Sequence, residues 1–95
     1  MYEIVLDGAG WNQPDDLYDA FFRAVGAPSW HGHNFNALRD SIATGRINKI
    51  DVPYLIRLTN YSSIGPGAKG ATDGFIGLIK QLHSSGCPVG INVED

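Results

Sequence analysis

The chain has 95 residues, which suits one domain over residues 1–95 and leaves no room for two. Hydrophobic residues make up 43% of the sequence, enough for a packed core and too many for a disordered chain. The formal net charge is −3 and the Lys and Arg residues are scattered, which argues against a general nucleic-acid binder, because such a protein needs a basic stripe to neutralise phosphates.

The N-terminal part of the chain predicts a strand followed by a helix. Residues 4–6 form an unbroken apolar run, typical of a strand that is buried on both faces. Pro14 suits the first turn of a helix, and Asp15 and Asp16 suit its positive end. Gly26 is expected to end this helix. Its apolar stripe, with spacings of three and four residues, consists of Leu17, Ala20, Phe21, Ala24 and Val25.

A loop over residues 29–33 leads to a second, shorter helix. Asn34 is a suitable N-cap, and we expect the helix to continue to about Ala43. At about 100° per residue, the apolar side chains fall on an inner face that consists of Phe35, Leu38 and Ile42. The opposite, outer face consists of Asn36, Arg39, Asp40 and Ala43.

A second strand is predicted over residues 52–58, with Pro53 at its start, where the ladder needs no donor. Residues 60–70 are rich in turn residues. The third strand is predicted from the alternation of Val89, Ile91 and Val93.

The last helix is expected from about residue 71 to residue 84. Its apolar face consists of Phe75, Leu78, Ile79 and Leu82. Gly74 and Gly77 lie inside this helix, where glycine is unfavourable. They indicate a close backbone approach, either to the sheet or to something outside the chain.

The resulting order of elements is strand, helix, helix, strand, helix, strand (β-α-α-β-α-β). Long crossovers that contain helices imply parallel pairing of the strands. The sequence therefore predicts an α/β fold in which helices pack over a three-stranded parallel sheet.

Few residues fit a chemical site. His31 and His33 are spaced as metal ligands can be, but no further ligand follows at a matching spacing, and such histidines are usual in polar loops. Cys87, between a glycine and a proline, fits a small buried hydrophobe rather than a nucleophile. We therefore predict no enzyme activity, metal or cofactor. A metal-dependent or hydrolytic enzyme that uses the two histidines stays open as a further hypothesis.

The cellular location is predicted from features that the sequence lacks. The first residues run directly into a strand rather than a signal peptide, and a single cysteine leaves no internal disulfide. No apolar run approaches the length of a membrane span. We expect a cytoplasmic protein that contacts neither membrane nor nucleic acid and is a monomer when free.

Residues 28–40 differ from the rest of the chain. Trp30, His31 and His33 gather in one loop, and the helix that follows has a polar, partly charged outer face. An aromatic residue on a loop that is braced by a rigid helix suits protein recognition. The pattern equally allows Trp30 to pack into the core and the polar face to be merely solvated.

From Pro28 to Asp40 the sequence reads Pro-x-aromatic-x-Gly-x-Asn-hydrophobic-x-Ala-Leu-x-Asp, which resembles the signature of the barstar family of ribonuclease inhibitors. The order of elements and Gly86-Cys87 before the last strand are similar as well. The resemblance implies an intracellular inhibitor that plugs the active site of a secreted ribonuclease with the loop and helix of residues 30–40. Its partner would be a ribonuclease or a nuclease toxin encoded beside it.

The resemblance gives each matching position a role. Trp30 corresponds to an aromatic contact residue, and Gly32 and Asn34 correspond to residues that shape the loop and reach the enzyme. Phe35 corresponds to a hydrophobic interface residue. Asp40 corresponds to the carboxylate that imitates a substrate phosphate among the cationic groups of the enzyme.

The acidic character of the family pattern is thinner in this chain. Asn36 occupies a position that is acidic in the family pattern, and Arg39 occupies one that is aromatic. Gln81 occupies the position of a family carboxylate on the last helix. We therefore expect weak binding to the family's best-known enzyme and a partner with a less basic pocket; the alternative is a non-nuclease protein partner. The predicted partner-binding residues are Trp30, His31, Gly32, Asn34, Phe35, Asn36, Arg39, Asp40, Ala43, Leu78 and Gln81.

Overall fold

The computed structural model describes residues 2–28, 32–44 and 47–95. The strands in this part of the chain are β1 (Tyr2–Asp7), β2 (Tyr54–Thr59) and β3 (Val89–Val93). The helices are α1 (Pro14–Val25), α2 (Phe35–Ala43) and α3 (Pro66–Ser84), with a short 3-10 helix, η1 (Tyr61–Ser63). The order of strands and α-helices is the predicted one.

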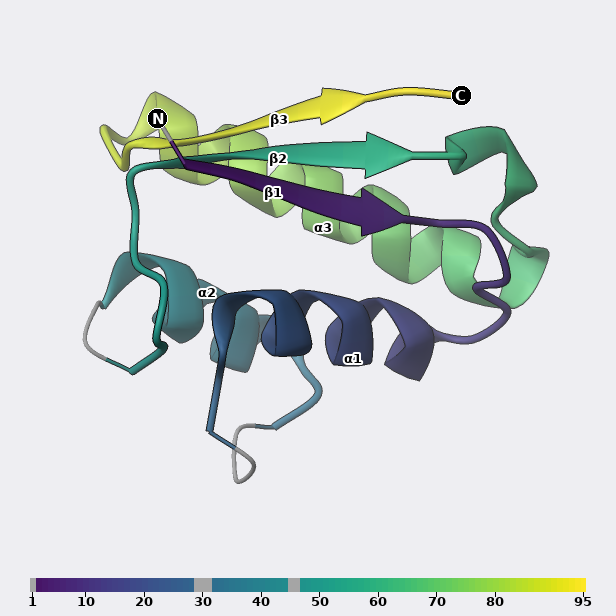
Figure 1. Cartoon of the computed structure of the whole chain (residues 1–95), viewed down its shortest axis with the longest axis horizontal. Coiled ribbons are helices and arrows are strands. Elements are labelled where there is room, and N and C mark those ends of the chain that lie inside the picture. Colours follow the sequence, from purple (N-terminus) through teal and green to yellow (C-terminus); the bar gives the residue numbers. More distant parts are fainter. Residues whose placement is uncertain (1, 29–31, 45–46) are drawn as a thin grey trace.

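The strands form one parallel sheet with β2 in the middle (Figure 1). Ile56 of β2 lies opposite Ile4 of β1 and Ile91 of β3. Because side chains at paired positions point to the same face, these three isoleucines belong to one face of the sheet. The predicted α/β fold with a three-stranded parallel sheet is confirmed.

The helices cover one face of this sheet and leave the other open. Ile4 and Leu6 of β1 are buried, whereas Val5 between them is 54% exposed. The strand β2 alternates in the same way between buried and half-buried residues. The prediction that the first strand is buried on both faces is therefore wrong, because no helix of the described residues covers the side on which Val5 lies.

The core fills the space between the covered face and the helices. Phe21 of α1, Tyr54 of β2 and Phe75 of α3 are fully buried there. The rings of Phe21 and Phe75 lie 5.3 Å apart, centroid to centroid, in a tilted contact. These aromatic side chains fix α1 and α3 against each other and against the sheet.

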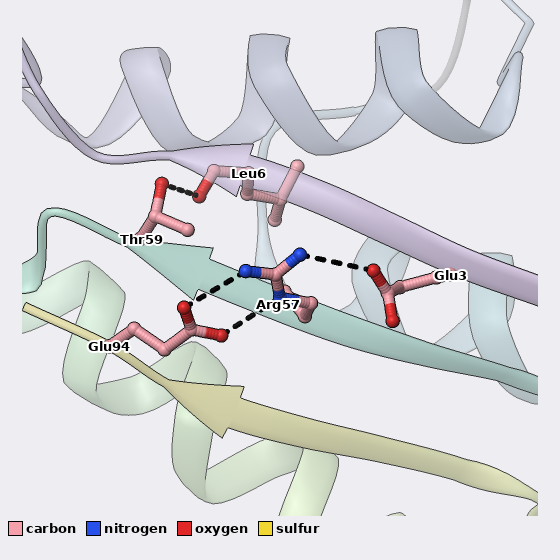
Figure 2. Close-up of polar contacts among 5 residues, drawn as sticks. All are labelled: Glu3, Leu6, Arg57, Thr59 and Glu94. Atoms are coloured by element: carbon pink, nitrogen blue, oxygen red, sulfur yellow. Dashed lines mark hydrogen bonds and ion pairs between the residues drawn. The ribbon is translucent and has the colours of Figure 1, made fainter.

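On the open face, Arg57 of β2 ties neighbouring strands together (Figure 2). Its Nε and Nη2 donate hydrogen bonds to the carboxylate of Glu94 at 2.9 and 3.0 Å, and its Nη1 donates to Oε1 of Glu3 at 3.2 Å. Glu3 lies on β1 and Glu94 directly follows β3. The open face thus carries a polar network that spans the sheet.

The helix α1 begins and ends as predicted. Pro14 is its first residue, and Oδ2 of Asp16 accepts hydrogen bonds from the backbone N–H groups of Asn12 and Gln13 at 2.8 and 3.1 Å. Gly26 follows the helix at a φ of 70°, in the left-handed region that favours glycine. The buried face consists of Leu17, Tyr18, Phe21, Phe22 and Val25, so the predicted Ala20 and Ala24 lie at its margin.

The helix α3 begins five residues earlier than predicted, at Pro66 rather than residue 71. A side chain at Gly67 would place its Cβ 2.2 Å from the carbonyl oxygen of Asn12, so glycine allows the helix to pass this backbone closely. One residue later, Ala68 is fully buried. The glycine-rich segment is helical because it packs against the chain that enters α1, which local turn propensity does not reveal.

The remaining strands need only small corrections. The strand β2 begins at Tyr54 rather than at residue 52, so Pro53 lies just before the strand and not at its start as predicted. Proline lacks the N–H that a ladder position requires. The strand β3 covers the predicted residues 89–93.

Candidate partner-binding surface

The helix α2 is held rigidly on its inner side. Oδ1 of Asn34 accepts a hydrogen bond from the N–H of Ala37 at 2.8 Å, which is the predicted N-cap. Leu38 and Ile42 are buried in the core. Ser41 is buried as well, and the side chain of Asn48 donates to its carbonyl oxygen at 2.8 Å and to its hydroxyl. These contacts present the outer side of the helix in one orientation.

The outer side of α2 is exposed along its whole length. Asn36, Arg39, Asp40 and Ala43 are all exposed, as the helical periodicity predicts. The α2 surface is defined here as these four residues together with Phe35 and Gln81. It combines one carboxylate, one guanidinium, two amides, a methyl group and an aromatic ring.

Phe35 does not lie on the inner face of α2, where the periodicity places it. Its side chain is 43% exposed, and its ring lies over Gly74 of α3. A Cβ at Gly74 would lie 2.5 Å from Cζ of Phe35. The close approach that Gly74 indicates is therefore made by this ring rather than by the sheet.

Gly77, the second glycine that the sequence analysis singles out in this helix, lies in open space. It is exposed, and an added Cβ would meet no atom within 4 Å. No described residue of the chain explains the absence of a side chain there.

Arg39 reaches from α2 across to α3. Its Nη2 donates a hydrogen bond to Oε1 of Gln81 at 3.2 Å. The guanidinium is thereby directed toward α3, although it neighbours Asp40 in the sequence. Gln81 is exposed and belongs to the same continuous surface.

The comparison with known families decides what kind of protein carries this surface. Residues 1–85 match the model of a family described as Barstar (barnase inhibitor). The chain belongs to the barstar family. None of the curated proteins compared with it matches. Barstar-family members are inhibitors of ribonucleases rather than enzymes, so this chain is a ribonuclease-inhibitor-like protein.

The other predicted contact residues of this barstar-family chain are placed differently. Gly32 and Asn34 are exposed beside α2. Leu78 is only 7% exposed and packs in the core, so little of its surface is available to a partner. Trp30 and His31 lie outside the described residues, and their role stays a prediction.

His33 lies against α1 rather than toward the outer side of α2. Its Nδ1 is 3.0 Å from Oδ1 of Asp15, and its Nε2 is 3.5 Å from Oδ1 of Asp19. Sequence reasoning interprets Asp15 only as a favourable charge at the start of a helix and gives Asp19 no role. Asp15 and Asp19 are four residues apart, which places both carboxylates on one side of a helix. This spacing could have indicated their shared contact with His33.

The residues that the structure describes give no support to a metal or thiol site. Among the described residues, no three His, Cys, Asp or Glu side chains are grouped so that they could hold a metal ion. Cys87 is partly buried against the core, and this burial raises the pKa of its thiol, which disfavours the reactive thiolate. In the described ranges, no helix is long and apolar enough to cross a bilayer.

A hollow of about 380 Å³ lies between α3 and β3, away from the α2 surface. Leu55, Lys80, His83, Gly90 and Asn92 are among the residues that line it. None of the described partner-binding residues takes part in its wall. It is therefore separate from the surface that the family resemblance predicts.

Proposed function

We propose that the chain inhibits a ribonuclease by covering its active site with the segment of residues 30–40 and the α2 surface, with the carboxylate of Asp40 in the place of a substrate phosphate. The observation that carries this proposal is the position of Asp40 in a barstar-family chain. Asp40 is exposed on the outer side of α2, a helix that is capped by Asn34 and buried on its inner side. An inhibitor of this kind needs neither catalytic group nor cofactor, because occlusion suffices.

Charge supports the role of Asp40. A ribonuclease active site is cationic because it binds phosphate, and a carboxylate can accept charge-assisted hydrogen bonds from Arg, Lys and His groups there. A side chain that stands on a rigid helix loses little conformational freedom on binding. Within the described residues, no ion pair occupies the carboxylate of Asp40.

The same surface argues for a partner less basic than barnase, the enzyme named in the family description. Asn36 is neutral, Arg39 is cationic and Gln81 is neutral, so Asp40 is the single anionic side chain of the α2 surface. With fewer complementary ion pairs, association with a strongly basic enzyme is slower and the discrimination between partners is weaker. We propose a nuclease toxin encoded beside the inhibitor as the partner, and an inhibitor that acts inside the cell as a monomer.

The test is an RNA-cleavage assay with barnase and with the nuclease encoded by the neighbouring gene as probes. Asp40→Ala should lower the affinity for the inhibited enzyme by at least about 2 kcal/mol, roughly thirtyfold, because it removes a carboxylate paired in a desolvated pocket. Asp95→Asn removes one charge at the far end of the chain and should change the affinity less than twofold. Unchanged inhibition by Asp40→Ala would refute the phosphate-mimic model.

A partner that is not a nuclease is the second candidate. Asn36 is neutral, and the guanidinium of Arg39 is hydrogen-bonded to Gln81. Both observations favour this candidate, because a cationic enzyme would be attracted by acidic side chains at these positions. If the chain inhibits neither probe and the proteins it captures include no nuclease, this second function replaces the first.

A further inference from the structure

His33 sits in a socket on α1, defined here as Asp15, Tyr18, Asp19 and Phe22. Tyr18 and Phe22 are buried, at 7% exposure each, and His33 lies over both rings. Its imidazole is stacked on Tyr18 at 5.4 Å and 17°, and tilted toward Phe22 at 6.0 Å and 37°. The two aromatic residues are four positions apart, so they form one continuous floor on the helix.

The carboxylates of Asp15 and Asp19 lie beside the two nitrogens of the His33 ring. Asp15 lies 3.0 Å from Nδ1 and Asp19 lies 3.5 Å from Nε2, so each ring nitrogen faces one carboxylate. Both carboxylates are more than half exposed, at 62% and 56%, and the ring itself is 39% exposed. Water therefore weakens the pairing without removing it.

Each ring nitrogen of His33 has a hydrogen-bonding or ionic partner on α1, and the ring as a whole is held by four side chains of this one helix. The remaining ionisable group in the socket is Tyr18, whose pKa is raised by burial and by the charge of Asp15, so its phenol stays neutral.

We infer that His33 is a positioning residue that holds residues 32–34 against α1 before any partner binds. The backbone of these residues leads directly into the N-cap Asn34 and the α2 surface. A loop that is already ordered pays less conformational entropy on binding. Because His33 faces α1, it does not itself contact the partner. The effect on binding rests on the proposed function, whereas the ordering of the loop does not.

The first experiment uses the free protein and needs no partner. NMR measures the Overhauser contacts between the ring at position 33 and the rings of Tyr18 and Phe22, together with the ¹⁵N relaxation of residues 32–34. The wild type should show these contacts and a rigid backbone at residues 32–34. The double variant Asp15→Asn, Asp19→Asn should weaken the contacts and make residues 32–34 more mobile, because it removes both carboxylates that face the ring.

His33→Phe is the matched control, since it keeps an aromatic ring on Tyr18 and Phe22 but has no N–H group. In the His33→Phe background, the change Asp15→Asn, Asp19→Asn should have no further effect on the mobility of residues 32–34. Mobile residues 32–34 in the wild type, or an order of these residues that the double variant leaves unchanged, overturns the positioning role.

The second experiment measures affinity for the ribonuclease inhibited in the assay above. His33→Phe and the double variant Asp15→Asn, Asp19→Asn should each lower the affinity by about three- to tenfold, the effect of about one exposed charge-assisted contact. The two changes together should lower it no further than either alone, because both remove the same contacts. A loss of affinity in His33→Phe that the double variant does not share would make His33 a partner contact and overturn its positioning role. If no ribonuclease binds, the proposed function fails and the NMR experiment alone decides the positioning role of His33.

Discussion

The carboxylates of this chain differ in what they contact, and that difference assigns them to folding or to recognition. Asp16 caps α1, Glu94 holds Arg57 on the open face of the sheet, and Asp15 faces His33. In the part of the chain that the structure describes, no hydrogen bond or ion pair engages the carboxylate of Asp40. A carboxylate left available on a rigid helix is suited to a partner rather than to the fold.

The Arg57–Glu94 pair predicts how the fold responds to acid. Hydrogen bonds from Arg57 lower the pKa of Glu94 below the ordinary value of 4.5. A carboxyl group whose pKa is lower in the folded state stabilises the fold above its ordinary pKa, and this contribution disappears as the pH falls through the lowered value. The difference in urea midpoint between the wild type and Glu94→Gln should therefore be largest near neutral pH and vanish in acid.

Asp95→Asn is the control for this experiment, because Asp95 is an exposed neighbour without a hydrogen bond or ion pair among the described residues. Its urea midpoint should follow that of the wild type at every pH. A Glu94→Gln difference that persists unchanged in acid would show that the ion pair does not contribute through its charge.

At the scale of elements, α2 and α3 build the α2 surface together. The ring of Phe35 lies over Gly74, and Arg39 donates to Gln81, so each helix completes the surface of the other. Gly74 and Gly77 of α3 differ in this respect, because Gly74 is covered and Gly77 is open.

Alanine at these two glycines should have different effects on stability. Gly77→Ala should raise the free energy of unfolding by about 0.5–1 kcal/mol, since alanine favours the helix and the added methyl group meets nothing. Gly74→Ala gains the same helix propensity but must push the ring of Phe35 aside, so its net effect should be near zero or destabilising. Urea denaturation measures both. Equal stabilisation by the two variants would contradict the position of Phe35.

The elements that depend on local sequence are the ones that the sequence predicts well. Pro14, Gly26 and the Asn34 cap set the ends of α1 and the start of α2 through their own backbone chemistry, and the structure has them as predicted. The start of α3 depends instead on a close approach between Gly67 and the backbone of Asn12. That contact joins distant parts of the chain and leaves no local pattern.

The candidate site likewise combines features set by local sequence with features set by contacts between distant parts of the chain. The outer face of α2, with Asp40 on it, follows from helical periodicity alone. The exposure of Phe35, the burial of Leu78 and the socket for His33 each depend on which helix lies beside them. For the strands, Val5 shows that an apolar residue in an apolar run need not be buried, because its side chain is on a face that no described helix covers.

For the molecule as a whole, the net charge of −3 would attract the cationic enzyme of the proposed function over a long range. The association rate constant with the inhibited ribonuclease should fall roughly tenfold as NaCl rises from about 0.05 M to about 0.5 M, because salt screens this attraction. Stopped-flow fluorescence measures the rate. Asp40→Asn should flatten the salt dependence, and a rate independent of salt in the wild type would exclude electrostatic steering.

The hydrogen bond between Arg39 and Gln81 joins residues that lie 42 positions apart in the chain. A synthetic peptide that copies residues 30–40 would lack both Gln81 and the glycine beneath Phe35, so it would not reproduce the surface. The same arrangement gives evolution a second route to new partners. In the proposed complex, substitutions on α3 would redirect Arg39 and Phe35, and thereby change which nuclease is bound, while the sequence of α2 stays as it is.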